Sequence, residues 1–312
     1  MNITEFIAAL PKAELHVHLE GSLEPSTVTE IAPEVSADEV RARYDYRNFS
    51  GFLEAYKWIV LLIRTPADYA LAARRLFTRL AAENVRYAEV NLSVGVILWK
   101  EQDVGAIYDA VRKESLNAPF PVRWIFDAVR QFGPTEALRV AELAAERVAG
   151  GVVGFGMGGD EARIASPEFA EAFRFARAAG LHLAPHAGET TSAESVWGAL
   201  RLGAERIGHG IRAVEDPDLL AHLRREDIPL EISLSSNLMT GAVLSLRDHP
   251  LRRIADAGVP VVLNTDDPAM FRTTLCREYE LASVEQGFSA GELRQLAENG
   301  FRYAFTGSAR GS

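Results

Sequence analysis

The chain reads ELHVHLEG at residues 14–21, and this stretch predicts a strand that carries two histidines. In an extended strand alternate side chains point the same way, so His16 and His18 project from one face and offer two imidazoles to a single point. Imidazole nitrogen suits zinc and its first-row neighbours, but two ligands do not hold a catalytic ion. The chain must therefore supply further ligands from elsewhere, unless the two histidines are only a chance pair on a half-buried strand.

Short β-branched runs recur along the chain and alternate with longer, alanine-rich segments of helical periodicity. The predicted strands cover residues 14–19, 86–92, 122–129, 151–157, 181–186, 206–209, 229–234 and 260–266. The predicted helices include residues 67–84, 133–148, 167–179, 193–202, 216–225 and 250–257. A strand followed by a helix, repeated eight times, predicts an α/β fold of the parallel (β/α)₈ barrel type, also called a TIM barrel.

One connection is much longer than the others. Residues 21–85 separate the first two predicted strands and include an aromatic and aliphatic stretch at 49–63. A connection of this length is expected to fold into extra helices over the top of the barrel. Since the chain has no linker and no low-complexity segment, we expect residues 1–312 to form one barrel domain.

The composition predicts a cytoplasmic enzyme that acts on a small molecule. The formal net charge of −10 and the lack of a long basic run argue against a nucleic-acid partner. No apolar run reaches membrane-spanning length, and the N-terminus lacks the pattern of a signal peptide. The single cysteine, Cys276, excludes an intrachain disulfide and a cysteine-rich zinc site. The composition does not predict the oligomeric state.

Polar side chains follow several predicted strands, at the barrel end where active sites lie. These groups are GGDE at residues 158–161, HAGE at 186–189, HG at 209–210 and NTDDP at 264–268. Taken singly, each has an ordinary structural explanation: a tight turn, a helix start, a buried histidine or a helix N-terminus. Four histidines and at least three acids at one barrel mouth are harder to explain as packing, and they predict a catalytic site.

The ordered set HVHLEG, HAGET, IGHG and NTDDP, together with GVVGFGMGGDE and SSNLMTGAV, resembles the adenosine deaminase family of the amidohydrolase superfamily. The similarity extends from about Pro11 to Phe301. It implies that His16, His18, His186 and Asp266 bind one zinc ion. Three neutral imidazoles and one carboxylate leave such a site with net positive charge, which lowers the pKa of bound water towards about 7.

The same resemblance implies the catalytic roles. Glu189 would donate a proton to purine N1, which requires a carboxyl group with a raised pKa. His209 would orient or deprotonate the attacking water, and Asp266 would accept a hydrogen bond from that water.

Further residues would bind the substrate. Asp267 would bind purine N7 and the Gly159 N–H would face N3, where a residue without a Cβ allows close approach to a flat base. His18 would also border the substrate. The product would be the 6-oxo purine and ammonia.

The sequence predicts the reaction class, but it leaves open which amino compound is the substrate. Glu20 stands where many adenosine deaminases carry an aspartate that contacts the ribose 5′-hydroxyl, and adenine deaminases also tend to have glutamate there. Residues 235–241 look more like the nucleoside enzymes. Glu20, the apolar segment 91–99 and segment 127–132 together resemble deaminases of aminodeoxyfutalosine, a 5′-modified adenine nucleoside of menaquinone synthesis. Arg130 would then face a benzoate of the substrate, or else form a salt bridge within the barrel top.

The substrate therefore has two alternatives: a 6-aminopurine nucleoside, such as adenosine or its 5′-modified forms, and free adenine. Two rival classes also remain. A two-metal hydrolase on this barrel would usually need a bridging carboxylated lysine, and no lysine stands at a suitable strand end. A non-catalytic nucleoside-binding protein would be expected to lack a ligand or Glu189, and neither is missing.

Overall fold

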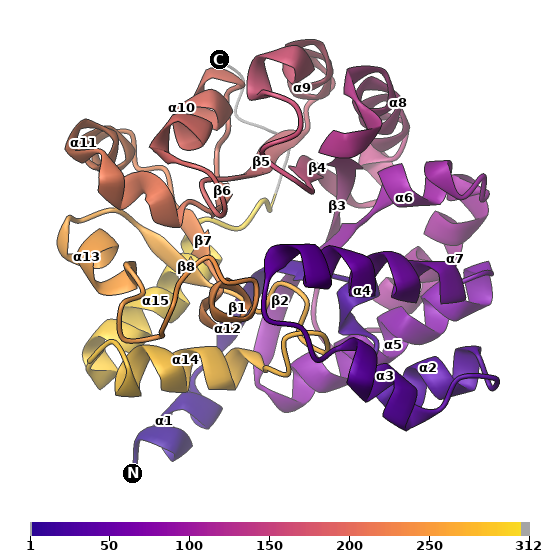
Figure 1. The fold of residues 1–312 in the computed structure, drawn as a ribbon, viewed down its shortest axis with the longest axis horizontal. Helices are drawn as coiled ribbons and strands as arrows, with labels where there is room; N and C mark the ends of the chain where they lie inside the picture. Colours follow the sequence, from indigo (N-terminus) through magenta and orange to yellow (C-terminus); the bar gives the residue numbers. More distant parts are fainter. Residues whose placement is uncertain (1, 307–312) are drawn as a thin grey trace.

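The computed structural model describes residues 2–306, and eight parallel strands form its centre in the order in which they occur along the chain. The strands are β1 (Lys12–His18), β2 (Val85–Leu92), β3 (Val122–Val129), β4 (Val152–Gly158), β5 (His182–Ala187), β6 (Ile207–His209), β7 (Leu230–Ile232) and β8 (Val261–Leu263). Each pairs in parallel with the next. The predicted (β/α)₈ barrel is confirmed (Figure 1).

The segment after β8 closes the barrel against β1. The Asp266 N–H donates to the carbonyl of His16 at 2.9 Å, and the His18 N–H donates to the carbonyl of Asp266 at 2.8 Å. Two residues before Asp266, the side-chain oxygen of Asn264 accepts a hydrogen bond from the Leu15 N–H at 2.9 Å. The closure therefore joins the two sequence segments that carry the first histidines and the last aspartates.

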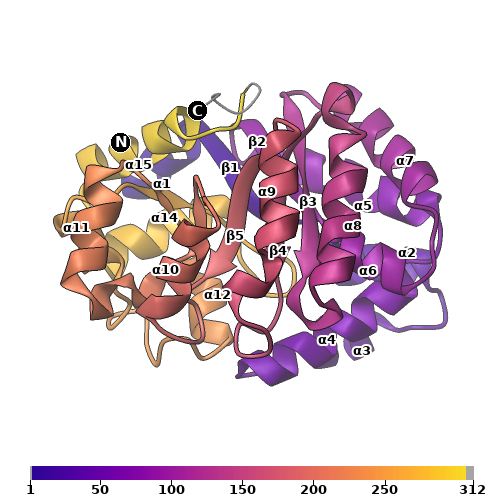
Figure 2. The same ribbon diagram turned by 90° about the horizontal axis from the view of Figure 1, so that it is seen from above.

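Helices surround the strands on the outside, and the core lies between the two layers (Figures 1 and 2). The helices from the end of the first connection onwards are α5 (Pro66–Ala82), α6 (Val94–Trp99), α7 (Val104–Leu116), α8 (Pro134–Ala145), α9 (Ala170–Ala178), α10 (Ala193–Arg201), α11 (Pro217–Arg225), α12 (Leu234–Met239), α13 (Leu251–Asp256), α14 (Leu275–Val284) and α15 (Ala290–Arg302). The short 3₁₀ helices are η1 (Glu20–Ser22), η2 (Arg130–Phe132), η3 (Val148–Gly150), η4 (Ser166–Phe169) and η5 (Ile211–Glu215). All six helices predicted from the periodicity overlap an observed helix.

The long first connection folds into extra helices, as predicted. Helix α1 (Ile3–Ala9) precedes β1, and α2 (Pro25–Ile31), α3 (Ala37–Arg43) and α4 (Phe49–Leu62) follow it. Helix α4 begins at Asn48, whose side chain accepts the Gly51 N–H at 2.8 Å. Figure 2 shows α3 and α4 at the end of the barrel opposite both termini. This end is the mouth where the strands terminate.

Two segments at the mouth differ from the sequence-based expectation. The stretch 91–99, expected as an apolar loop, contains α6. The seventh strand, expected to reach residue 234, ends at Ile232, and α12 follows directly. The buried carboxylate of Glu278, on α14, accepts the N–H groups of Leu234 and Ser235 and so caps the first turn of α12. That cap comes from a distant residue and leaves no local signal. No helix among residues 2–306 has the length and apolar character needed to cross a membrane.

Candidate metal centre and active site

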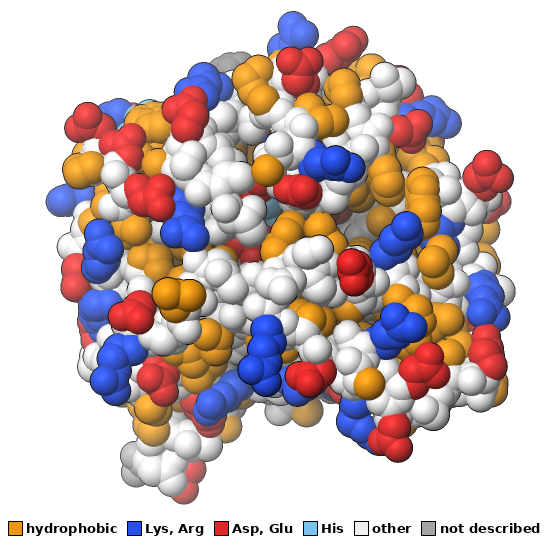
Figure 3. Space-filling model, viewed as in Figure 1, with side chains coloured by type: hydrophobic (Ala, Val, Ile, Leu, Met, Phe, Trp, Pro, Cys, Tyr) orange, Lys and Arg blue, Asp and Glu red, His pale blue; other side chains and the backbone are white. Residues whose placement is uncertain are grey.

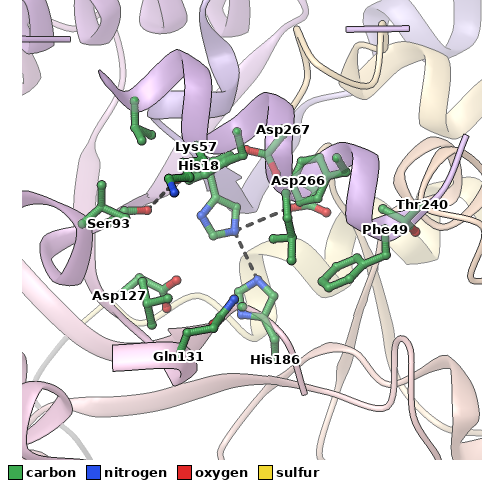
Figure 4. A pocket seen from close by; sticks show the side chains of 18 of the residues that line it. His18, Phe49, Lys57, Ser93, Asp127, Gln131, His186, Thr240, Asp266 and Asp267 are labelled. Atoms are coloured by element: carbon green, nitrogen blue, oxygen red, sulfur yellow. Dashed lines mark hydrogen bonds and ion pairs between the residues drawn. The ribbon is translucent and has the colours of Figure 1, made fainter. Parts of the chain in front are cut away.

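Five side chains from four strand ends meet at the centre of the mouth. The donor atoms of His16, His186, His209 and Asp266 all lie within 4.8 Å of one another. His18 joins them, and its Nε2 lies 3.1 Å from His186 Nε2, 3.3 Å from His16 Nε2 and 3.4 Å from Asp266 Oδ1. Figure 4 shows His18 facing both His186 and Asp266. The structure thus brings together all four predicted metal ligands, with His209 beside them.

These spacings fit a single divalent cation such as zinc. Ligand atoms about 2 Å from a tetrahedrally coordinated zinc ion lie roughly 3.3 Å from one another. His18 Nε2 lies at about this distance from the Nε2 atoms of His16 and His186, although nitrogen atoms of neutral imidazoles have little reason to gather without a shared proton or cation. His16 Nε2 also lies 3.5 Å from Asp266 Oδ1. Three imidazole nitrogens and one carboxylate oxygen are a donor set that zinc accepts.

Burial keeps most of these groups in the ligating form. Burial lowers the pKa of His18 to about 3 and the pKa of His186 well below its usual value, so both rings are neutral near pH 7. Burial opposes the charge on Asp266, but hydrogen bonding with His16 holds the pKa of its carboxyl group well below the usual range. The lone pairs of His18, His186 and Asp266 are therefore available to a cation near pH 7.

Two site residues adopt a strained backbone. His209 has a φ of 63° and Asp266 a φ of 62°, in the left-handed region that non-glycine residues seldom occupy. The Asp266 strain is held by its two hydrogen bonds to β1, which fix the carboxylate beside the histidines. Strain of this kind, at two strand ends of one mouth, is typical of a functional site.

A buried charge network orients His16. Its Nδ1 lies 3.0 Å from Glu231 Oε2, and the other Glu231 oxygen accepts from Arg206, which also donates to Glu89. Burial opposes protonation of His16, but the hydrogen bonds with Asp266 and Glu231 raise its pKa well above the usual value. A histidine ligand commonly donates its second ring N–H to a carboxylate, which fixes the ring and strengthens the ligand.

Replacing Glu231 with glutamine is expected to weaken metal binding about 10- to 100-fold, because His16 loses its carboxylate partner. Competition with a chromogenic chelator measures this affinity in the folded variant, and circular dichroism checks the fold. Glu226→Gln changes an exposed carboxylate and serves as the control. Equal metal affinity in the two variants would show that Glu231 does not support the centre.

Glu189 lies next to this cluster as a buried acid. Its carboxyl group accepts a hydrogen bond from the Thr240 hydroxyl at 3.1 Å and lies 3.7 Å from His209 Nε2. The Glu189 N–H donates to the carboxylate of Glu161, which fixes the main chain. Burial, with the nearby charges of Asp266 and Glu161, raises the pKa of Glu189 to about 8. The group is therefore a carboxylic acid near pH 7 and has a proton to donate.

His209 lies between the acid and the carboxylate of the cluster. Its Nε2 is 3.7 Å from Glu189 Oε2 and 3.8 Å from Asp266 Oδ2. On the far side of the ring, Nδ1 accepts from the Asn237 amide at 3.1 Å. Burial lowers the pKa of His209 to about 4, so the ring is neutral near pH 7, and because Nδ1 accepts, its hydrogen is on Nε2. The contact at Nδ1 fixes the ring so that Nε2 faces Glu189 and Asp266.

A cavity of about 360 Å³ opens from this cluster to the surface. Its volume lies within the range of about 300–1,000 Å³ that is usual for small-molecule sites. Figure 3 shows hydrophobic side chains around the hollow on the face that α4 borders. The cavity is lined by His18, Phe49, Phe52, Leu53, Tyr56, Lys57, Val60, Ser93, Val96, Trp99, Asp127, Val129, Gln131, Phe132, Gly158, Gly159, His186, Glu189, His209, Thr240, Asp266 and Asp267.

Two of the predicted base-binding residues, Gly159 and Asp267, line this cavity. Gly159 has a φ of +94°, and a Cβ at this position would lie 2.1 Å from the side-chain oxygen of Gln131. Burial and the charge of Asp266 raise the pKa of Asp267 well above its usual value, and its Oδ1 has no hydrogen-bond partner among the described residues. Gly21 makes room for it, since a Cβ there would lie 1.6 Å from Asp267 Oδ1. The cavity therefore contains a buried acid that has hydrogen-bonding capacity left for a ligand.

Arg130 and Glu20, two predicted substrate contacts, are buried beside the cavity. Arg130 does not line the cavity and donates to the main-chain carbonyl of His186 at 2.9 Å. It forms no ion pair among the described residues and holds the backbone of β5, while its contact with a substrate benzoate stays a prediction. Glu20 is also fully buried and accepts the Ser93 N–H at 3.1 Å. It reaches the cavity only through Ser93 and Tyr56, whose hydroxyls are 2.7 Å apart.

The sequence analysis missed several cavity residues. Asp127, at the end of β3, is buried with Oδ1 unpartnered among the described residues, and burial raises its pKa to about 8. Its position at a strand end was a usable signal. Lys57 lies on α4. The near-helical spacing of Phe52, Tyr56, Trp58 and Leu62 predicts that one face of this helix either lines the entrance or packs into the core, and Phe52 and Tyr56 line the cavity.

Comparison with known proteins agrees with this geometry. The family model described as adenosine deaminase matches residues 11–310. An aminodeoxyfutalosine deaminase from Streptomyces coelicolor is 43% identical, over 96% of this chain and 81% of the relative. The crystal structure of an adenine deaminase from Arthrobacter aurescens superposes with a TM-score of 0.90 at 29% identity, covering 96% of this chain and 95% of the other. An amidohydrolase from Burkholderia ambifaria, solved with bound zinc, has a TM-score of 0.89 at 26% identity, covering 98% and 89% of the two chains.

Proposed function

The chain belongs to the adenosine deaminase family, and the relatives compared above include deaminases of adenine-type compounds. We propose that it hydrolyses the 6-amino group of an adenine nucleoside and uses one zinc ion. The observation that carries the proposal is the pairing, across one cavity, of a buried acid that is protonated near neutral pH with a cluster of donor atoms at zinc spacing. An acid and a Lewis-acid site facing each other suit the addition of water to a purine ring.

We assign the metal to His16, His18, His186 and Asp266. His18 Nε2 lies within 3.4 Å of His16 Nε2, His186 Nε2 and Asp266 Oδ1, whereas His209 Nε2 lies 3.8 Å from Asp266 Oδ2, which favours His18 over His209 as the third imidazole. When bound, the cation supplies a Lewis acid that makes water nucleophilic at neutral pH.

The remaining groups orient the water and move protons. Asp266 accepts a proton from the attacking water and aims its oxygen at purine C6. His209 carries its ring hydrogen on Nε2, because Nδ1 accepts from Asn237, so it orients the water and stabilises the charge that develops on the oxygen. Glu189 delivers its proton to purine N1 as C6 accepts the oxygen. The amino group then leaves C6 as ammonia with the proton taken from the water, and the C6 hydroxyl returns a proton to Glu189 to give the 6-oxo purine.

The base is held by groups around the same cavity. Burial and the charge of Asp266 raise the pKa of Asp267, which favours the protonated carboxyl group that would donate a hydrogen bond to purine N7. Gly159 offers its main-chain N–H to N3, and the ring of His18 borders the base. These contacts set the orientation in which N1 faces Glu189.

The shape of the cavity favours a nucleoside over free adenine. The cavity continues past the cluster to Ser93 and Tyr56 and then to Lys57 and Trp99, farther than a base alone would fill. Within this class, aminodeoxyfutalosine is our leading substrate because its 5′ arm would occupy the outer cavity. The matching aminodeoxyfutalosine deaminase supports this choice, while the adenine deaminase structure keeps the free base as the alternative.

A spectrophotometric panel tests the choice. It contains adenosine, 2′-deoxyadenosine, methylthioadenosine, aminodeoxyfutalosine and adenine, each followed by the absorbance change of deamination. We expect kcat/KM to be highest for a nucleoside with an extended 5′ group. A kcat/KM for adenine above that of every nucleoside would overturn the nucleoside assignment.

A further inference from the structure

The outer end of the cavity has a cation and two stacked aromatic rings on its wall. Lys57 of α4 lies with its Nζ 5.7 Å from the centre of the Trp99 ring of α6. On η2, Phe132 stacks against Trp99, with ring centroids 6.0 Å apart and an interplanar angle of 15°. All three residues line the cavity, and Trp99 is 44% exposed. Three separate elements thus present one mixed surface at the mouth.

Lys57 has no carboxylate partner. Neither an ion pair nor a hydrogen bond joins its ammonium group to another of the residues 2–306, and Glu54, one turn earlier on α4, is not within ion-pair distance. The chain carries a net charge of −10, and exposed arginines such as Arg41, Arg64 and Arg302 pair with acids. Lys57 is also the sole lysine or arginine among the described residues that line the cavity. An unpaired cation at this position is available to a ligand.

The two helices that carry this surface are held together. Lys100, directly after α6, donates its ammonium group to the carbonyls of Val60 and Ile63 at the end of α4. These carbonyls would otherwise lack partners within the helix. The contact fixes α4 against α6, so Lys57 and Trp99 are positioned before any ligand arrives, which lowers the entropy lost on binding.

We propose that Lys57, Trp99 and Phe132 form a subsite for a flat, anionic group at the far end of the substrate, an aryl carboxylate in chemical class. The inference rests on the proposed nucleoside deaminase function, and it names the residues that would bind the aryl carboxylate at the end of the substrate's 5′ arm. Lys57 pairs with the carboxylate, and the exposed edge of the aromatic stack packs against the ring. The charged hydrogen bond between Lys57 and the carboxylate orients the ligand. Contact between the aromatic rings adds affinity by burying apolar surface.

The subsite takes the part that the sequence assigned to Arg130. That guanidinium is buried, does not line the cavity, and donates to the main-chain carbonyls of His186 and Ile164. Lys57 lies on α4, which borders the mouth, and lines the cavity. The recognition of the anion therefore depends on the long first connection rather than on a strand end.

The test compares aminodeoxyfutalosine with its methyl ester, two substrates that share the arm and the ring and differ only in the carboxylate charge. We expect the wild-type enzyme to favour the acid over the ester in kcat/KM by about tenfold, as for a hydrogen bond to a charged group. Lys57→Met should erase this preference through KM, whereas Lys57→Arg should keep most of it. Lys113→Met, an exposed lysine on α7, is the matched control and should show the wild-type preference.

The outcomes separate the subsite from the proposed function. An unchanged acid-to-ester ratio in Lys57→Met, with both nucleosides still deaminated, would overturn the subsite and leave the nucleoside deaminase standing. Turnover of adenine with neither nucleoside accepted would overturn both. Loss of the preference in Lys57→Met but not in Lys113→Met supports the subsite, and a further drop in affinity for both substrates in Trp99→Ala supports the role of the stacked rings.

Discussion

Glu189→Gln is expected to lower kcat by about 10²–10⁴-fold, the range typical for loss of a general acid. Glutamine keeps the size of the side chain and its contact with Thr240 but has no proton of suitable acidity for purine N1. Metal content and thermal unfolding should match those of the wild type, since Glu189 is not among the proposed ligands. Glu194→Gln, an exposed substitution on the following helix α10, should keep wild-type turnover.

The same assignment fixes the sign of the pH dependence. Burial raises the pKa of Glu189 to about 8, so the proton that the reaction needs is present below this pH and is lost above it. The rate should therefore fall as the pH rises through about 8, or somewhat lower when a cation is bound nearby. A kcat that stays level from neutral to strongly alkaline pH, or a Glu189→Gln enzyme with near wild-type kcat, would show that another group donates the proton.

His186→Ala is expected to remove stoichiometric metal and to lower kcat/KM by at least about 10³-fold, because a bound cation supplies several kcal/mol of charge stabilisation. His186 Nε2 is 3.1 Å from His18 Nε2, so its loss opens one side of the donor cluster. The readouts are elemental analysis and steady-state kinetics. His222→Ala, on the outer helix α11, should change neither. Full metal occupancy in His186→Ala would remove this residue from the ligand set.

The barrel and its cluster of donors were predictable because both depend on local pattern. Short β-branched runs separated by helical periodicity gave the eight strands, and the rule that strand ends share one mouth brought His16, His186 and Asp266 together. Closure of β1 against residues 264–266 follows from the same order of strands. No packing detail was needed for these conclusions.

Contacts that depend on packing between distant elements were not predictable. The direction of Arg130 is set by the backbone of β5, and the burial of Glu20 is set by Ser93 and Tyr56 from two other elements. Residues 94–99, VGVILW, are too short an apolar run to separate a helix from a loop by periodicity. Lys57 gave no signal at all, because a lysine on a helix is usually a solvated residue.

The central claim is that one divalent cation, held by side chains from both ends of the chain, is required for deamination. The direct measurement strips the enzyme with a chelator, then titrates zinc back while metal content and initial rate are followed together. The account predicts that activity is lost on stripping and returns in proportion to bound zinc, with a break at one ion per chain. Full activity in the metal-free enzyme, or a break at two ions per chain, would contradict it.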